Sequence, residues 1–134
     1  MAKKLYKKRR REGMYLSITQ ARSPEWVREN MDNPFRDWDD SGYISSSSAK
    51  RASTQYRKTR NELFALNAQN DPEAQTKAIA AVEEYTKNFN RMRDIETDGR
   101  DLIYEVLCSI IDNMNDSIID KSRLLDRFEE LRDF

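Results

Sequence analysis

The sequence predicts a mainly α-helical protein, a small three- or four-helix bundle with an extended basic, aromatic-rich N-terminal arm. Three observations predict this fold class. Apolar residues recur at helical spacing from about residue 49 onward, and strand-like alternation never exceeds a few residues. Helix-start signals precede these stretches. Cations are concentrated in the first 22 residues, although the net charge of all 134 residues is zero.

The N-terminal arm, residues 1–48, contains one predicted short helix at about 24–31. Ser-Pro-Glu-Trp at 23–26 is a helix-start signature, and Asn-Pro at 33–34 is a stop. We expect the rest of the arm to be irregular. It holds six of the thirteen aromatic residues of the chain, more than an unfolded linker usually has. We therefore expect the arm to dock, either on its own helices or on a partner.

The helical domain, residues 49–134, is predicted to open with a helix over about 49–69. Ser47 or Ser48 can cap this helix, because a serine oxygen accepts a hydrogen bond from a free N–H of the first turn. Its apolar residues form one face, which the polar Thr59 interrupts. The next helix is predicted to begin at Asp-Pro-Glu, residues 71–73, and to end at Thr-Asp-Gly, residues 97–99.

Two further helices are predicted to complete the domain. The segment 100–119 is the most apolar part of the chain and should form the centre of the core. It either continues to residue 119 or ends earlier, at Asn113 and the polar residues 115–116. The last helix is predicted over 121–132. A core of this size is shallow, so its stability alone is marginal.

The composition excludes several classes of chemistry. The chain has no histidine, which excludes histidine-based acid–base catalysis and every metal site that needs imidazole. One cysteine excludes an internal disulfide, and three glycines leave no glycine-rich phosphate loop. No acid–base pair or nucleophile stands out. We therefore expect a protein that is not an enzyme, with no cofactor and no small-molecule substrate.

The location follows from the apolar segments. No run of apolar residues is long enough to span a membrane, and none follows the basic N-terminus as in a secretory signal. Cys108 lies in an apolar stretch, which fits a reducing compartment. We expect the protein in the cytoplasm or within a virion or nucleoprotein particle, not secreted through a signal peptide and not bound to a membrane.

The first 22 residues carry eight lysines and arginines and one carboxylate, a net charge of +7. Such a cluster contacts nucleic-acid phosphates or an acidic protein surface, or is a solubilising tail, and the sequence leaves the three alternatives open. The candidate residues for binding nucleic acid or an acidic partner are Lys3, Lys4, Lys7, Lys8, Arg9, Arg10 and Arg11.

Large aromatic side chains in the arm are candidate anchors for a protein partner, since such residues dominate interfaces. The candidates are Tyr15, Trp26, Phe35, Trp38 and Tyr43. The sequence therefore predicts a non-enzymatic structural or adaptor subunit of a larger assembly, such as a virion or another nucleoprotein particle. Its partners would be protein subunits and nucleic acid. The alternative is a free-standing regulator that binds DNA or inhibits a protein partner.

Residues 37–48 resemble the twelve-residue calcium loop of the EF-hand family. Loop positions 1, 3, 5 and 7 are held by Asp37, Asp39, Ser41 and Tyr43. The resemblance implies a calcium ion bound by these four residues. The chain departs from the family at position 12, where the bidentate glutamate is replaced by Ser48. The alternative is an Asp-rich turn that leads into a helix, and no other metal site is expected.

Overall fold

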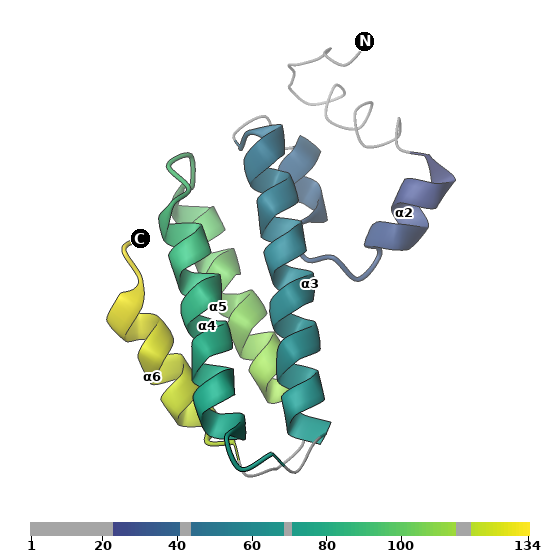
Figure 1. The fold of residues 1–134 in the computed structure, drawn as a ribbon. Helices are drawn as coiled ribbons and strands as arrows, with labels where there is room; N and C mark the ends of the chain where they lie inside the picture. The colour runs from purple at the N-terminus through teal and green to yellow at the C-terminus, as the bar shows by residue number, and fades with distance from the viewer. Residues whose placement is uncertain (1–22, 41–43, 69–70, 115–118) are drawn as a thin grey trace. The chain divides into compact units, whose positions relative to one another are not determined.

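The computed structural model describes residues 23–40, 44–68, 71–114 and 119–134, and these residues are mainly helical (Figure 1). The helices are α2 (Pro24–Asn30), η1 (Arg36–Asp40, a 3-10 helix), α3 (Ser46–Ala68), α4 (Ala74–Asn90), α5 (Thr97–Asp112) and α6 (Lys121–Leu131). The described segments contain no strand. The mainly α fold class is therefore confirmed. The chain forms two compact units, residues 1–53 and 54–134, so the division falls inside α3.

In the first unit, α2 is the short helix that the sequence predicts. The Ser23 hydroxyl accepts a hydrogen bond from the backbone N–H of Trp26 over 3.0 Å, and Pro24 occupies the first turn. Serine at the cap satisfies an N–H that has no partner within the helix. The helix ends at Asn30, three residues before the predicted Asn-Pro stop.

The segment after α2 was expected to be irregular, but a buried amide organises it. Asn33 is 1% exposed, and its Nδ2 donates to Asn30 Oδ1 (3.0 Å) and to Ser53 Oγ (2.8 Å). Its Oδ1 accepts from the backbone N–H of Phe35 over 3.0 Å. Because an unsatisfied buried amide is costly, these three bonds favour one path of the chain between α2 and the first turns of α3.

The start of α3 differs from the prediction. The helix begins at Ser46, not at about residue 49, and the capping residue is neither Ser47 nor Ser48. Instead the hydroxyl of Ser45 accepts from the backbone N–H of Ser48 over 3.1 Å. Four consecutive serines are chemically equivalent as caps, so the sequence alone cannot select one of them.

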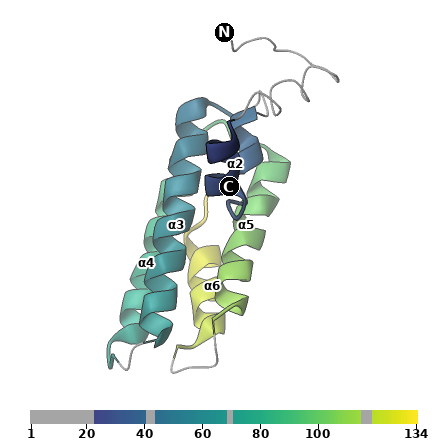
Figure 2. The same cartoon turned by 90° about the vertical axis from the view of Figure 1, so that its right-hand side faces the viewer.

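The core of the second unit is built around α4, which contacts α5 and α6 (Figures 1 and 2). Tyr85 is fully buried, and its hydroxyl donates to the backbone carbonyl of Ile103 on α5 over 2.6 Å. Its ring centroid lies 4.8 Å from that of Phe89 and 6.3 Å from that of Phe128 on α6. One tyrosine of α4 therefore contacts both neighbouring helices.

The helices α4 and α6 run in the same direction, and polar side chains join them at both ends. At the start, Gln75 Oε1 accepts from the backbone N–H of Asp120 over 2.6 Å. At the end, Asn90 Nδ2 donates to the Leu131 carbonyl (2.9 Å) and its Oδ1 accepts from the N–H of Asp133 (2.8 Å). These bonds fix α6 and the chain end after it.

The predicted end of α4 is wrong, and its start lies slightly later than predicted. The helix begins at Ala74, and in the turn before it the Asp71 carboxylate accepts from the N–H of Glu73 over 2.8 Å. It ends at Asn90 and not at residues 97–99. The Asn90 side chain is engaged by the C-terminal segment there. Gly99 is instead buried in the first turn of α5, where its small size, not its conformational freedom, suits the position.

The two last helices follow the sequence more closely. The buried residues of α5 confirm the predicted centre of the core, and they include Ile103, Val106, Leu107, Ile110 and Ile111. Of the two predicted ends, the earlier one is correct, since α5 ends at Asp112 with Asn113 as its C-cap. The last helix, α6, ends one residue earlier than predicted. None of the described helices is long and apolar enough to cross a membrane.

We predict that Asn90→Ala lowers the free energy of unfolding by about 1–2 kcal/mol, because two hydrogen bonds to the C-terminal segment are lost. Urea unfolding measures this as a lower midpoint with an unchanged slope. The matched control is Asn113→Ala, which removes only an exposed bond to the Ser109 carbonyl of the same helix. An equal effect of the two substitutions would contradict the structural role assigned to Asn90.

We predict that Tyr85 makes the protein sensitive to alkali. Burial raises the pKa of the Tyr85 phenol well above its ordinary value of 10.0. Below pH 10.0 the phenol is protonated in both the folded and the unfolded chain, so it adds no pH dependence to the stability. Above pH 10.0 the phenol ionises only in the unfolded chain, so the free energy of unfolding falls as the pH rises. Urea midpoints should therefore fall less steeply above about pH 10 in Tyr85→Phe than in wild type or in the control Tyr56→Phe.

Candidate polar pocket between two helices

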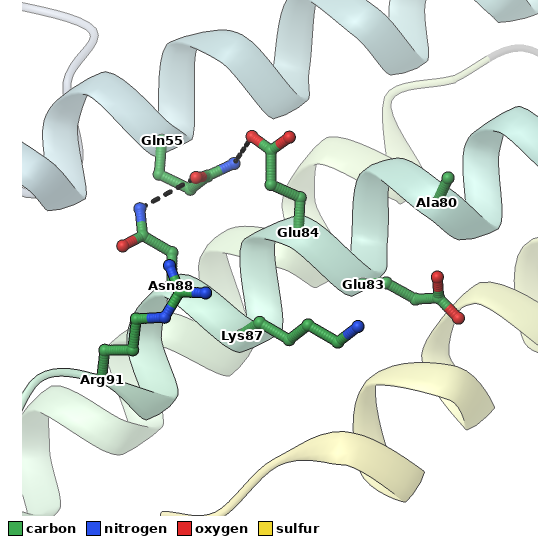
Figure 3. Close-up of a pocket in the computed structure, with 7 residues that line it drawn as sticks. All are labelled: Gln55, Ala80, Glu83, Glu84, Lys87, Asn88 and Arg91. Carbon is green, nitrogen blue, oxygen red and sulfur yellow. Dashed lines mark hydrogen bonds between the residues drawn. The ribbon is translucent and has the colours of Figure 1, made fainter.

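The pocket with the clearest functional chemistry lies between α3 and α4, inside the second unit. Its cavity volume is about 440 Å³, within the range of small-ligand sites. One lining residue comes from α3, and the others come from successive turns of α4 and from Arg91, the C-cap residue of that helix (Figure 3). The lining residues are Gln55, Ala80, Glu83, Glu84, Lys87, Asn88 and Arg91.

A buried amide forms the α3 side of the pocket. Gln55 is 4% exposed, and its Nε2 donates to Thr59 Oγ1 (2.9 Å) and to Glu84 Oε2 (3.2 Å). Its Oε1 accepts from Asn88 Nδ2 over 2.9 Å (Figure 3). Residues four apart share a helix face, so Gln55 and Thr59 of α3 oppose Glu84 and Asn88 of α4. This network holds the two helices together by polar contacts.

Both carboxylates of the pocket are held in ion pairs. Lys58 Nζ lies 2.9 Å from Glu84 Oε2, and Arg127 Nε of α6 lies 2.8 Å from Glu83 Oε2. The hydrogen bond from Lys58 lowers the pKa of Glu84, although desolvation partly opposes this. The same bond raises the pKa of Lys58. Glu84 is thus ionised at neutral pH, and each of the two carboxylates has a cation beside it.

Two cations of the pocket are not compensated in this way. Lys87 and Arg91 lie one helical turn apart at the end of α4 and are exposed. In the part of the chain that the structure describes, neither forms an ion pair. The described residues also contain no cluster of three or more acidic, cysteine or histidine side chains able to hold a metal. The arrangement can therefore bind an anionic group.

The cationic candidates of the N-terminal arm, Lys3 to Arg11, lie outside the described residues, as do Tyr15 and Tyr43. Of the other docking candidates, Trp26 is half-buried. Phe35 is fully buried and Trp38 is 7% exposed, and their ring centroids lie 4.8 Å apart. Phe35 and Trp38 are thus covered by other residues of the same chain. Docking of the aromatic candidates on a protein partner stays a prediction.

Two exposed apolar residues on α2 were missed by the sequence analysis. Val27 is 42% exposed and Met31, which follows α2, is 66% exposed. Their spacing of four residues places them on one side of the helix. This spacing of two apolar residues was the available signal in the sequence. Spacing alone does not show whether a helix face is exposed to solvent or buried in the protein.

The EF-hand resemblance is not tested by the described residues. Asp37 and Asp39 lie in η1, and the backbone N–H of Ser48 is bonded to Ser45 in the first turn of α3. Ser41 and Tyr43, the other two implied ligands, lie outside the description. Binding of calcium by this segment therefore stays a prediction.

We predict that Lys58→Gln raises the pKa of Glu84 toward its ordinary value, because the hydrogen bond that favours the carboxylate is lost. The ¹³C chemical shift of the Glu84 side-chain carboxyl, followed during an acid titration, measures this pKa. In wild type, the stabilisation from this pair is complete above the ordinary glutamate pKa and is lost as the pH falls through the lowered value.

The control for this titration is Lys77→Gln, which removes a different exposed pair, the one with Asp71. It should leave Glu84 unchanged. A Glu84 titration that is the same in wild type and in Lys58→Gln would show that the ion pair does not persist in solution.

Comparison of the chain with protein-family models, with curated proteins and with solved structures finds no match in any of the three.

Proposed function

We propose that the chain is a non-enzymatic structural or adaptor subunit of a larger assembly, such as a virion or another nucleoprotein particle, and that it is located in the cytoplasm or within that particle. In this proposal the basic N-terminal segment binds nucleic acid or an acidic surface of a protein partner. The observation that carries the proposal is the separation of charge along the sequence. Residues 1–22 have a net charge of +7, whereas residues 54–134 have a net charge of −5.

The charge separation favours a polyanion as the ligand of the N-terminal segment. Five consecutive cations, residues 7–11, repel one another, and neutralisation by phosphates relieves this repulsion and releases counterions. The second unit has the opposite net charge and repels a polyanion. The contact is therefore expected to be made by the N-terminal segment.

Contact with a protein subunit of the assembly is assigned to α2. Phe35 and Trp38 are already buried, so the available side chains are Trp26 and its exposed neighbours Val27 and Met31. A half-buried tryptophan next to exposed aliphatic side chains is typical of interface anchors.

The experiment that tests the proposal is binding of labelled single-stranded and duplex DNA across a salt series. We compare wild type with a variant in which residues 7–11 are all glutamine. If the five cations contact single-stranded DNA, the variant should lose about 3–4 units of the log–log salt slope, at ~0.7 per phosphate. The affinity of this variant for DNA at low salt should also be lower than that of wild type.

The charge-preserving control replaces Lys3, Lys4, Lys7 and Lys8 by arginine. This variant should bind DNA as wild type does, because the neutralised phosphates are the same in number. Equal affinity for different sequences indicates a structural subunit, and a clear sequence preference indicates the alternative regulator. Absence of binding even at low salt would contradict the nucleic-acid part of the proposal and leave the acidic protein surface.

A further inference from the structure

We propose that the pocket between α3 and α4 is a binding site for a phosphate group, held by Lys87 and Arg91. All its residues lie within 54–134, so the inference is independent of the proposed role of the N-terminal segment. The two cations line a cavity of about 440 Å³. This volume exceeds that of a phosphate ion and leaves room for the group that carries the phosphate.

The carboxylates of the pocket do not cancel these cations. Glu84 is paired with Lys58 and hydrogen-bonded by Gln55, and Glu83 is paired with Arg127 on the far side. Lys58 and Arg127 thus offset the two carboxylates from outside the lining of the pocket, and Arg127 is shared with Glu130. Among the described residues, Lys87 and Arg91 form no ion pair, so their charges remain available to an anion that enters.

The amide network gives the site a fixed wall. The donor group of Asn88, between Lys87 and Arg91 in sequence, is bonded to the buried Gln55, so this part of α4 is held against α3. In Figure 3 the Arg91 side chain extends toward Asn88, whereas the Lys87 side chain extends away from this wall, toward the side of Glu83. Both are exposed and change rotamer within nanoseconds, so they can turn toward one anion, at a cost in side-chain entropy.

A phosphate fits these donors better than a carboxylate. The arginine guanidinium binds two oxygens in a planar fork, and the lysine ammonium adds a third donor as a point charge. A carboxylate has two oxygens, which the arginine alone satisfies. A phosphate has further oxygens and a larger charge, so it engages both side chains.

The test is titration of the full-length protein with inorganic phosphate at constant ionic strength, followed by the backbone amide ¹H–¹⁵N shifts. Saturable shifts at residues 84–91 are expected in wild type. In Lys87→Gln/Arg91→Gln, affinity should fall by about tenfold or more, since charge-assisted bonds are lost. Lys58→Gln should also weaken binding, because it leaves Glu84 uncompensated.

The matched control is Arg93→Gln/Arg100→Gln, which removes the same two positive charges from exposed positions outside the pocket. It should bind phosphate as wild type does. Unfolding midpoints of all variants establish that each is folded.

A second titration, with a short single-stranded oligonucleotide, distinguishes the source of the phosphate. If the oligonucleotide shifts the amide signals of residues 84–91, the site binds nucleic-acid backbone phosphates. If inorganic phosphate shifts these signals and the oligonucleotide does not, the site binds a small phosphorylated ligand.

Three results would overturn the inference. The first is no saturable shift at residues 84–91 with inorganic phosphate, which would mean that Lys87 and Arg91 only complement the negative end of the α4 dipole. The second is an equal loss of affinity in the control variant, which would show a non-specific charge effect. The third is equal binding of acetate, which would show that the site does not distinguish phosphate from carboxylate.

Discussion

The buried phenol of Tyr85 sets the position of α4, and the second unit depends on that position. Its hydroxyl donates to the Ile103 carbonyl of α5 over 2.6 Å, and its ring lies against Phe89 and Phe128. A buried hydroxyl without a partner is costly, so α4 and α5 cannot slide along each other without breaking this bond. The polar pairs at the two ends of α4 and α6 then fix the direction of α6.

The position of α4 divides its surface into an apolar side and a polar side. The apolar side, with Val82, Tyr85 and Phe89, is buried in the core. The polar side faces α3, where Glu84 and Asn88 meet the buried Gln55. The two acids of this side pair with Lys58 of α3 and Arg127 of α6, so they help to hold α4 between its neighbours. Among the described residues, Lys87 and Arg91, which follow these acids in the sequence, form no ion pair.

The sequence predicted those parts of the fold that depend on local chemistry. The apolar period of α5, the Ser-Pro start of α2 and the bounds of α6 follow from neighbouring residues, and the structure agrees within a few residues. The errors at α4 have distant causes. Asn90 ends the helix where its side chain binds residues more than forty positions later in the chain. No local signal marks that contact, and a glycine nine residues later looks like the better stop.

The pocket was missed for the same reason. Its central contact joins Gln55 to Asn88, 33 residues apart, and neither residue belongs to a recognisable motif. The one local sign was Thr59, a polar residue on the apolar face of its helix, which turns out to be fully buried and bonded to Gln55. A polar residue on an otherwise apolar face requires a polar partner if it is buried. Here the partner of Thr59 is Gln55 of the same helix, and Gln55 in turn bonds Glu84 and Asn88 of α4 and forms one wall of the pocket.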